Sequence, residues 1–318
     1  MEDLKSSFSN HVQDLQLQII DAMKELDPSL KIQKDEWSRL DRAGNPGGGG
    51  ITCALTGEVF ENAGVNTSIV HGEMDPEFGK KILRESNVDS GDSKEKKYHM
   101  WASGISLILH PYNPRIPTVH ANWRYFEMYD ADGNIVTQWF GGGQDLTPYY
   151  LFEEDAIHFH SVCKEACDKH HPEFYPKYKK QCDSYFWNTH RDEARGVGGL
   201  FFDYLKATDE FFMEDRYNFT TEIGNSFLNS YLPIVERRKN IEYNQKHKDW
   251  QEVRRGRYVE FNLVHDKGTL FGLKTNGRIE SILMSLPPTV QWKYNHHPDE
   301  GSEEHKLIEV LKAPKDWV

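Results

Sequence analysis

Residues 101–147 constrain the fold more than any other part of the sequence. They contain three apolar runs, rich in Ile, Val, Tyr, Phe and Trp, in which apolar and polar residues alternate. A proline-rich segment at 110–117 separates the first run from the second, and Asp130-Ala-Asp-Gly133 separates the second from the third. Alternating runs divided by turn signals of this kind predict three consecutive antiparallel strands.

One face of the predicted strands carries polar residues. Because residues i and i+2 of a strand share a face, His120, Asn122 and Arg124 point to one side, and Ser106 of the neighbouring strand can join them. Any one of these residues alone would more often be simply solvated. The whole group, next to the glycines at 141–143, favours a binding or catalytic site, because several glycines together suggest close approach of the backbone to a ligand.

The composition indicates a globular protein. Aromatic residues make up 13 % of the 318 residues, and no run approaches the ~18 apolar residues of a membrane span. The N-terminal stretch contains acidic residues and no apolar signal segment, so we expect a cytoplasmic location. Cys163 and Cys167, four apart on a predicted helix, could join histidines on zinc, but buried free thiols are the preferred interpretation.

The net charge argues against nucleic acid as the main partner. The chain has 38 basic and 50 acidic residues, a formal charge of -12, whereas binding to phosphates needs a basic surface. A small anionic ligand would need a local group of arginines. Candidates for such a group are Arg124, Arg191, Arg195, Arg278 and the segment 254–257.

The remaining segments complete an α+β pattern. We expect helices over 1–27, from Thr147-Pro148 to about 169, over 175–190 and over much of 208–248. We expect further strands over 51–55, 57–60, 65–71, 195–203, 256–265 and 269–274. Residues 44–50 predict a flexible loop, and 75–97 a polar surface excursion. With no repeat and no linker, residues 1–318 are expected to form one domain with a large antiparallel sheet.

Several long blocks of sequence carry a family resemblance. They include GISLILHPYNPRIPTVHANWRYFE, WFGGGQDLTPYYLFEEDAIHFH, THRDEARGVGGLFFDYL and RRGRYVEFNLVHDKGTLFGLKTNGRIESILMSLPP. Together they cover nearly the whole chain, which resembles the oxygen-dependent coproporphyrinogen III oxidases. The resemblance implies a large, flat antiparallel sheet with helices on both sides, in a homodimer whose dimerisation strands lie in 258–293. It implies conversion of two propionates of coproporphyrinogen III to vinyl groups in haem biosynthesis, with O2 consumed and CO2 and hydrogen peroxide released.

The resemblance also implies roles for individual residues. His120 matches the proton donor, and Asp145 and Asp266 match acidic positions that pair with pyrrole N–H groups. Positions matching substrate contacts are Ser106, Asn122, Trp123, Arg124, Arg195, Asn276, Gly277 and Arg278. The three arginines in this set suit propionate carboxylates, because a guanidinium offers two parallel donors.

The resemblance gives two answers about metal. In bacterial members a divalent metal is assigned to four histidines, which match His110, His120, His160 and His190. A metal-bound nitrogen cannot also donate a proton, so the two roles of His120 need different nitrogens or one of them is wrong. We prefer a reaction that needs no metal, flavin, haem or nicotinamide, because an easily oxidised pyrrole substrate can react with O2. Two alternatives stay open at this point: a non-catalytic tetrapyrrole-binding protein, and a metal-dependent oxygenase that uses these histidines.

Overall fold

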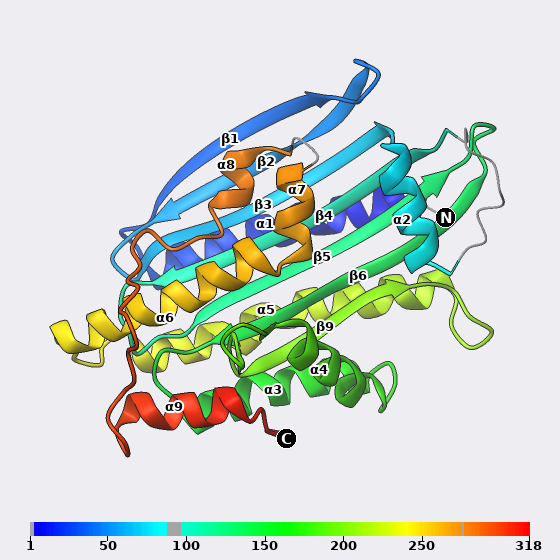
Figure 1. Cartoon of the computed structure of the whole chain (residues 1–318). Coiled ribbons are helices and arrows are strands. Elements are labelled where there is room, and N and C mark those ends of the chain that lie inside the picture. Colours follow the sequence, from blue (N-terminus) through cyan, green and yellow to red (C-terminus); the bar gives the residue numbers. More distant parts are fainter. Residues whose placement is uncertain (1–2, 88–96, 275–276) are drawn as a thin grey trace.

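A seven-stranded antiparallel sheet dominates the structure (Figure 1). The structure is a computed structural model that describes residues 3–87, 97–274 and 277–318. The strands follow the order β1 (Lys31–Leu40), β2 (Pro46–Thr56), β3 (Phe60–Glu73), β4 (His99–Pro111), β5 (Thr118–Tyr129), β6 (Ile135–Thr147) and β9 (Gly198–Leu205). A small separate pair consists of β7 (Trp187–Asn188) and β8 (Glu193–Ala194). The three strands predicted in 101–147 are confirmed as β4, β5 and β6.

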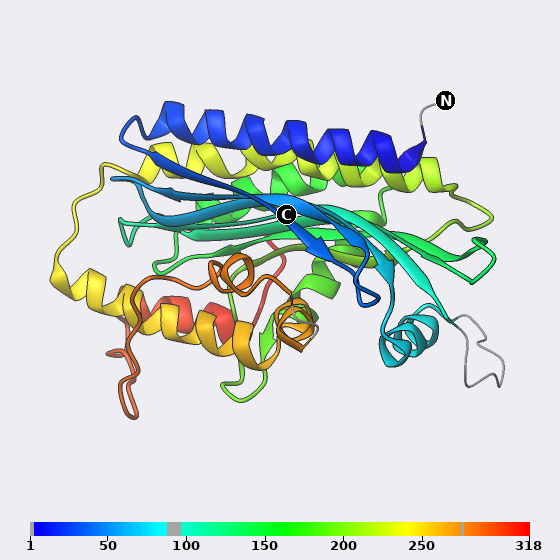
Figure 2. The same cartoon turned by 90° about the horizontal axis from the view of Figure 1, so that it is seen from above.

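Helices cover both faces of the sheet (Figure 2). On one side lie α1 (Leu4–Leu26), α3 (Glu153–Asp168) and α5 (Met213–Arg238), with α4 (Phe174–Tyr185) against β9. On the other lie α2 (Pro76–Glu85), α6 (Gln245–Val264), α7 (Lys267–Lys274), α8 (Ile279–Leu283) and α9 (Glu303–Lys312). We call these sides the α1 face and the α6 face. The predicted α+β fold, with one large antiparallel sheet between helices, is confirmed.

The main core lies on the α1 face. The buried residues Phe8, Val12 and Leu15 of α1 recur every three or four positions, which is the spacing of one side of a helix. They meet Tyr125 and Phe140 of the sheet, whose rings stack with centroids 4.3 Å apart. Because strand residues alternate between faces, burial of these residues on the α1 face sends His120 and its even-numbered neighbours to the α6 face.

The strands predicted in 256–274 are wrong, because this part of the chain is helical. The buried residues Trp250, Val253, Tyr258 and Phe261 follow helical spacing along α6, and the Asn244 side chain caps the helix by accepting from the His247 N–H. The apolar pattern of a short run fits both a strand and a helix, which explains the error. In the described part of 258–293 we find the end of α6, then α7 and α8, and no strand. Dimerisation strands are therefore absent from the described residues of that segment.

Three boundaries also differ from prediction. Much of the expected loop at 44–50 belongs to β2, which pairs with β1, an unpredicted strand that is exposed along nearly all of its length. Of the two short strands expected between 57 and 71, the second lies within β3, whereas residues 57–59 form the turn that leads into it. The helix expected at Thr147-Pro148 begins at Glu153, because Thr147 still pairs with Thr118 in the sheet. None of the described helices combines the length and apolar character that a membrane span requires.

Candidate functional site

The α6 face of β5 is open only in its middle. At one end Thr118 is buried, and at the other Phe126 and Met128 pack in the apolar cluster that includes α2. Between these ends the side chains are partly exposed. Ser106 of β4, which lies opposite Asn122, is exposed. We call the set of Ser106, His120, Asn122 and Arg124 the polar window.

Small residues surround the polar window within the sheet. In the register of the strands, Gly143 lies opposite Asn122, and both Gly104 and Gly141 lie opposite Arg124. The middle glycine of the 141–143 run faces the core instead, where a Cβ on Gly142 would lie 2.8 Å from Cδ1 of Trp123. The sheet therefore offers a low floor around the polar side chains, on which a flat ligand can lie.

His120 and Asp145 form a hydrogen-bonded pair at the edge of the window. Nδ1 of His120 lies 2.9 Å from Oδ1 of Asp145, which is only 2 % exposed. Burial tends to raise the pKa of Asp145, but the guanidinium of Arg195 and the His120 ring outweigh this effect and hold the pKa below its usual value. An ionised carboxylate only accepts hydrogen bonds, so Nδ1 carries the proton. Nε2 has no hydrogen-bond partner among the described residues, and it can exchange a proton with a ligand.

Arg195 supports this pair from within the protein. Its Nη2 lies 2.8 Å from both carboxylate oxygens of Asp145, and its Nη1 donates to Oδ1 of Asn262 at 2.9 Å. The Phe186 ring lies 3.9 Å from its Cζ, and the residue is 4 % exposed. In this structure the Arg195 guanidinium is buried behind Asp145 and does not face the window, so its contact with a propionate stays a prediction. Asn262 was missed because its segment was read as a strand, whereas α6 turns it toward Arg195.

Two other predicted roles also do not agree with the geometry. Asp145 is buried, and both its oxygens are held by Arg195 and His120, so its pairing with a pyrrole N–H stays a prediction that needs these contacts to change. The Trp123 side chain is 1 % exposed and lies in the core on the α1 face, so it cannot touch a ligand in the window. Strand alternation already places residue 123 on the face opposite residues 122 and 124.

Arg124 and Arg278 are the two predicted arginines that stay partly exposed. Arg124 donates to the Asn122 side chain, and its Nη2 lies 3.0 Å from Oδ2 of Asp203. Arg278 pairs with Asp35 and lies over the ring of Trp37, with Cζ 5.9 Å from the centroid. Trp37 and Arg124 belong to one row of paired residues that runs from β1 to β5. At the spacing of neighbouring strands, those two backbone positions are about 19 Å apart.

Asp266 lies at the start of α7. Its Oδ2 accepts from the Thr269 N–H at 2.7 Å, and its Oδ1 accepts from the Tyr185 hydroxyl at 3.0 Å. The Tyr185 ring stacks on Phe201 at 4.0 Å, and Phe201 lies opposite Gly143 in the row that contains Asn122. Each oxygen keeps a free lone pair, so the pairing of Asp266 with a pyrrole N–H stays a prediction. Gly277 closes a turn with Gly272, and Asn276 lies outside the described residues.

The structure does not bring the four predicted metal-binding histidines together. His110 is buried, with Nε2 2.9 Å from the Ser285 carbonyl, and burial lowers its pKa to about 3. His160 is held by the Tyr175 hydroxyl and the Val197 carbonyl, and burial lowers its pKa to about 4. Both rings are thus neutral and hold the fold in place.

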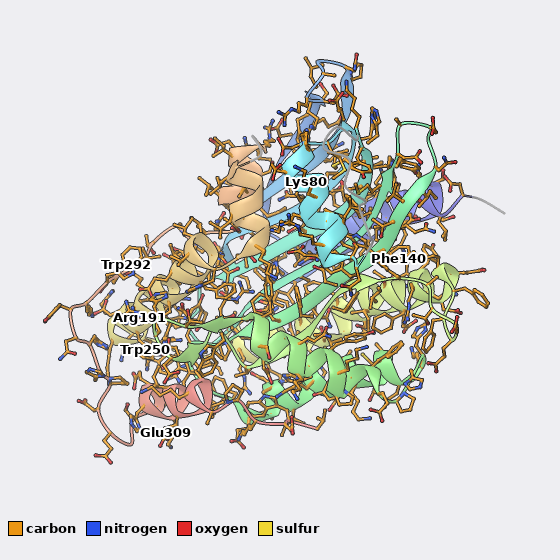
Figure 3. The ribbon with its side chains drawn as sticks, turned by 45° about the vertical axis from the view of Figure 1, so that its right-hand side comes forward. Lys80, Phe140, Arg191, Trp250, Trp292 and Glu309 are labelled. Atoms are coloured by element: carbon orange, nitrogen blue, oxygen red, sulfur yellow. The ribbon has the colours of Figure 1, made fainter. Side chains whose placement is uncertain are left out.

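His190 lies at a third location, beside α6. Its Nε2 lies 2.8 Å from Glu260, which also binds Arg191 and Trp292, both labelled in Figure 3. Over the residues that the structure describes, no three His, Cys, Asp or Glu side chains are arranged to hold a metal ion. The predicted tetrahistidine set is therefore not formed, and neither is a zinc site at Cys163 and Cys167, which are buried free thiols as preferred.

Comparison with known proteins gives a consistent result. The family profile described as coproporphyrinogen III oxidase matches residues 7–317. Coproporphyrinogen-III oxidase 1, chloroplastic, of Arabidopsis thaliana is 49 % identical over 99 % of this chain and 80 % of its own length. The oxygen-dependent coproporphyrinogen-III oxidase of Francisella philomiragia is 48 % identical over 100 % of both chains. The mitochondrial enzyme of Homo sapiens is 46 % identical over 99 % of this chain and 68 % of its own length.

Proposed function

The chain belongs to the coproporphyrinogen III oxidase family, and from that premise we propose that the polar window is its active site. It is an oxygen-dependent oxidase that converts two propionates of coproporphyrinogen III to vinyl groups on the pathway to haem. The observation that carries this conclusion is the identity of 46–49 % to enzymes of this name along essentially the whole chain. The product with two vinyl groups is protoporphyrinogen IX.

The reaction defines what the site must do. For each propionate, the bond to the carboxylate and one C–H bond at the β carbon break, and the vinyl double bond forms. O2 takes up the two electrons, together with one proton from the carbon and one from solvent, and leaves as hydrogen peroxide, while the carboxylate leaves as CO2. The protein must therefore hold an anionic macrocycle, move protons, and stabilise positive charge on the electron-rich ring.

The residues of the window are suited to these tasks. His120 presents Nε2 as the proton-exchanging atom, while Asp145, Arg195 and Asn262 fix the ring from behind. Arg124 and Arg278 are the partly exposed guanidiniums that would hold propionates. Asp266, at the side of the window next to Phe201, would accept a pyrrole N–H.

A direct test supplies the porphyrinogen first without oxygen and then in air, while CO2, peroxide and the vinyl product are measured. We expect binding without reaction under nitrogen, and two CO2 and two peroxide per macrocycle after air is admitted. Binding with no oxygen-dependent CO2 release would instead support the non-catalytic tetrapyrrole-binding protein.

We also propose that the reaction needs no metal and no flavin, haem or nicotinamide. Support comes from the four separate hydrogen-bonding environments of His110, His120, His160 and His190. Exhaustive chelation, checked by elemental analysis, should leave turnover unchanged; activity restored only by added metal would favour the metal-dependent oxygenase.

A homodimer and a cytoplasmic location complete the proposal. The exposed edge strand β1 is a surface that a second copy could cover, since an open strand edge is commonly paired or protected. Sedimentation equilibrium tests the dimer, and cell fractionation tests the location.

A further inference from the structure

Arg124 is held on several sides. Its Nη1 donates to the Asn122 side chain, its Nη2 forms an ion pair with Oδ2 of Asp203 at 3.0 Å, and its Cζ lies 5.7 Å from the ring centroid of Trp139. The side chains of Arg124 and Asp203 are 32 % and 27 % exposed. The pair is thus accessible, and it is electrically neutral before any ligand arrives.

The backbone of β9 places the Asp203 side chain next to the Arg124 guanidinium. The pairing of β6 with β9 is irregular there, since the register shifts between Phe140 and Gly142. The next residue, Tyr204, has a backbone φ of 53°, a conformation that a non-glycine residue seldom adopts. Its N–H donates to Oδ1 of Asp203 at 3.0 Å. The Tyr204 ring packs on Trp139, with centroids 4.8 Å apart. A locally strained backbone thus fixes a carboxylate next to the arginine.

Gly141 leaves the space that the ion pair occupies. A Cβ at this position would lie 2.7 Å from Oδ1 of Asp203 and 3.1 Å from Cζ of Arg124. The two charged groups therefore lie over the bare backbone of β6, on the α6 face. Gly141, the irregular pairing of β9 and the packing of Tyr204 on Trp139 together hold Asp203 beside Arg124.

We propose that Asp203 is an internal counter-ion, which a substrate propionate displaces from Arg124 and which pairs with Arg124 again once that carboxylate has left as CO2. The proposal rests on the proposed function and adds to it a residue that sets the affinity for the substrate and does not itself react. A propionate that takes over the guanidinium exchanges one ion pair for another, so charge attraction contributes little net affinity. Without Asp203, the same propionate would meet an uncompensated cation and bind more tightly.

The experiment uses the full chain and coproporphyrin III, the unreactive oxidised macrocycle with the same four propionates. Its affinity is measured by fluorescence titration at low and high salt for the wild type and for Asp203→Asn. Asparagine keeps an oxygen for the Tyr204 N–H, so the bulge is retained. Glu222→Gln is the matched control. Glu222 of α5 is 30 % exposed and forms a 2.6 Å ion pair with Lys169 at the end of α3, so this change removes the same charge away from the window.

We expect Asp203→Asn to bind coproporphyrin up to about fivefold more tightly at low salt, the change typical of one partly exposed ion pair. The salt dependence of binding should be steeper in this variant, because binding then forms an ion pair instead of exchanging one. Asp203→Glu and Glu222→Gln should resemble the wild type. The tetra-amide of the porphyrin, which has the same ring without charge, should bind equally to all four proteins.

Three results would overturn the proposal: unchanged or weaker coproporphyrin binding in Asp203→Asn, equal tightening for the tetra-amide, or the same gain in Glu222→Gln. Turnover gives a separate readout, in which KM for the porphyrinogen should fall in Asp203→Asn. A failure of the proposed function looks different, since the wild type would then release no CO2 in air whatever the porphyrin titrations show.

Discussion

His120 lies with Nδ1 2.9 Å from a carboxylate oxygen of Asp145, so the protein uses one ring nitrogen and leaves the other to the polar window. Asp145 is ionised and buried, and it fixes both the orientation of the ring and the position of its proton. The proton-exchanging atom, Nε2, therefore belongs to a rigid strand and not to a loop. We therefore expect different effects from replacing the His120 ring and from replacing Asp145, which holds it.

Replacing His120 by alanine should lower kcat far more than it raises KM. The ring is the group that we expect to move a proton, and general acid–base catalysis is typically worth about 100- to 10,000-fold. Steady-state kinetics on the porphyrinogen give both constants. The control is His158→Ala, which removes a histidine of α3 that is bonded to the Asn229 carbonyl away from the window. An unchanged kcat in His120→Ala would contradict the assigned role.

Replacing Asp145 by asparagine should reduce both stability and turnover. The change leaves the buried Arg195 guanidinium without its charge partner, a loss of about 3–5 kcal/mol in the free energy of unfolding. It also removes the negative charge and replaces one of the two acceptor oxygens by an NH2 donor, so the His120 proton is held less firmly on Nδ1. Asn262→Ala is the graded comparison, because it removes only one hydrogen bond to Arg195 and should cost about 1–3 kcal/mol. Urea unfolding and kcat, measured on both variants, should rank them in this order; equal effects would argue against a connected chain of residues.

Replacing Arg278 by alanine should weaken substrate binding and leave kcat largely intact. This arginine lies on the β1 side of the α6 face, over Trp37, whereas the proton-exchanging ring lies on β5. Loss of one propionate contact should raise KM about tenfold, as expected for a charge-assisted hydrogen bond. Asp35→Asn provides the comparison, since it removes only the partner of Arg278. A fall in kcat as large as the rise in KM would place Arg278 at the reacting carbon instead.

The sheet was predictable where turn signals and alternation agreed, and the helical cover of the α6 face was not. Strands β4, β5 and β6 have proline or Asp-Gly turns between them and alternate along their length. The apolar run that contains Tyr258 and Phe261 is short enough to fit the two-residue repeat of a strand or the 3.6-residue repeat of a helix. In the structure it is helical, and these two residues pack on Arg195 and Phe186. β1 was missed because an exposed edge strand carries no apolar pattern to detect.

The part of the site that lies on the strands was predictable from the alternation of strand residues. Alternation placed His120, Asn122 and Arg124 on one face together with Ser106, and the structure agrees. It could not reveal that Arg195 lies behind Asp145 and not in front of a ligand, because that depends on how α6 packs. Asp203 had a usable but unused signal: it ends the segment 195–203 that was predicted as a strand, and alternation along a strand puts it on the same face as Phe201. The bulge that turns Asp203 toward Arg124 has no such signal.

Acid should destabilise the protein through its buried histidines. The pKa of His160 is lowered to about 4 by burial, so the folded chain stays neutral at pH values where the unfolded chain, with a pKa near 6.5, takes up a proton. The contribution of His160 to the free energy of unfolding is therefore fully present above pH 6.5 and is lost as the pH falls toward 4. His110, whose pKa is also lowered by burial, adds to the same loss. One such group contributes a slope of about 1.4 kcal/mol per pH unit. In His160→Gln, urea unfolding between about pH 5 and 6 should show a flatter slope by roughly this amount, whereas His158→Gln should keep the wild-type slope.

The glycine run gives a test that separates the fold from the site. A Cβ on Gly143 would lie 2.2 Å from the carbonyl oxygen of Leu200, which is backbone and cannot move aside, so Gly143→Ala should destabilise the sheet by several kcal/mol. A Cβ on Gly141 meets the far ends of the Arg124 and Asp203 side chains, which can shift. Gly141→Ala should therefore keep most of the unfolding free energy and alter the affinity for coproporphyrin III. If instead both variants lose stability equally while Gly141→Ala binds porphyrin normally, the charged pair does not lie where the ligand binds.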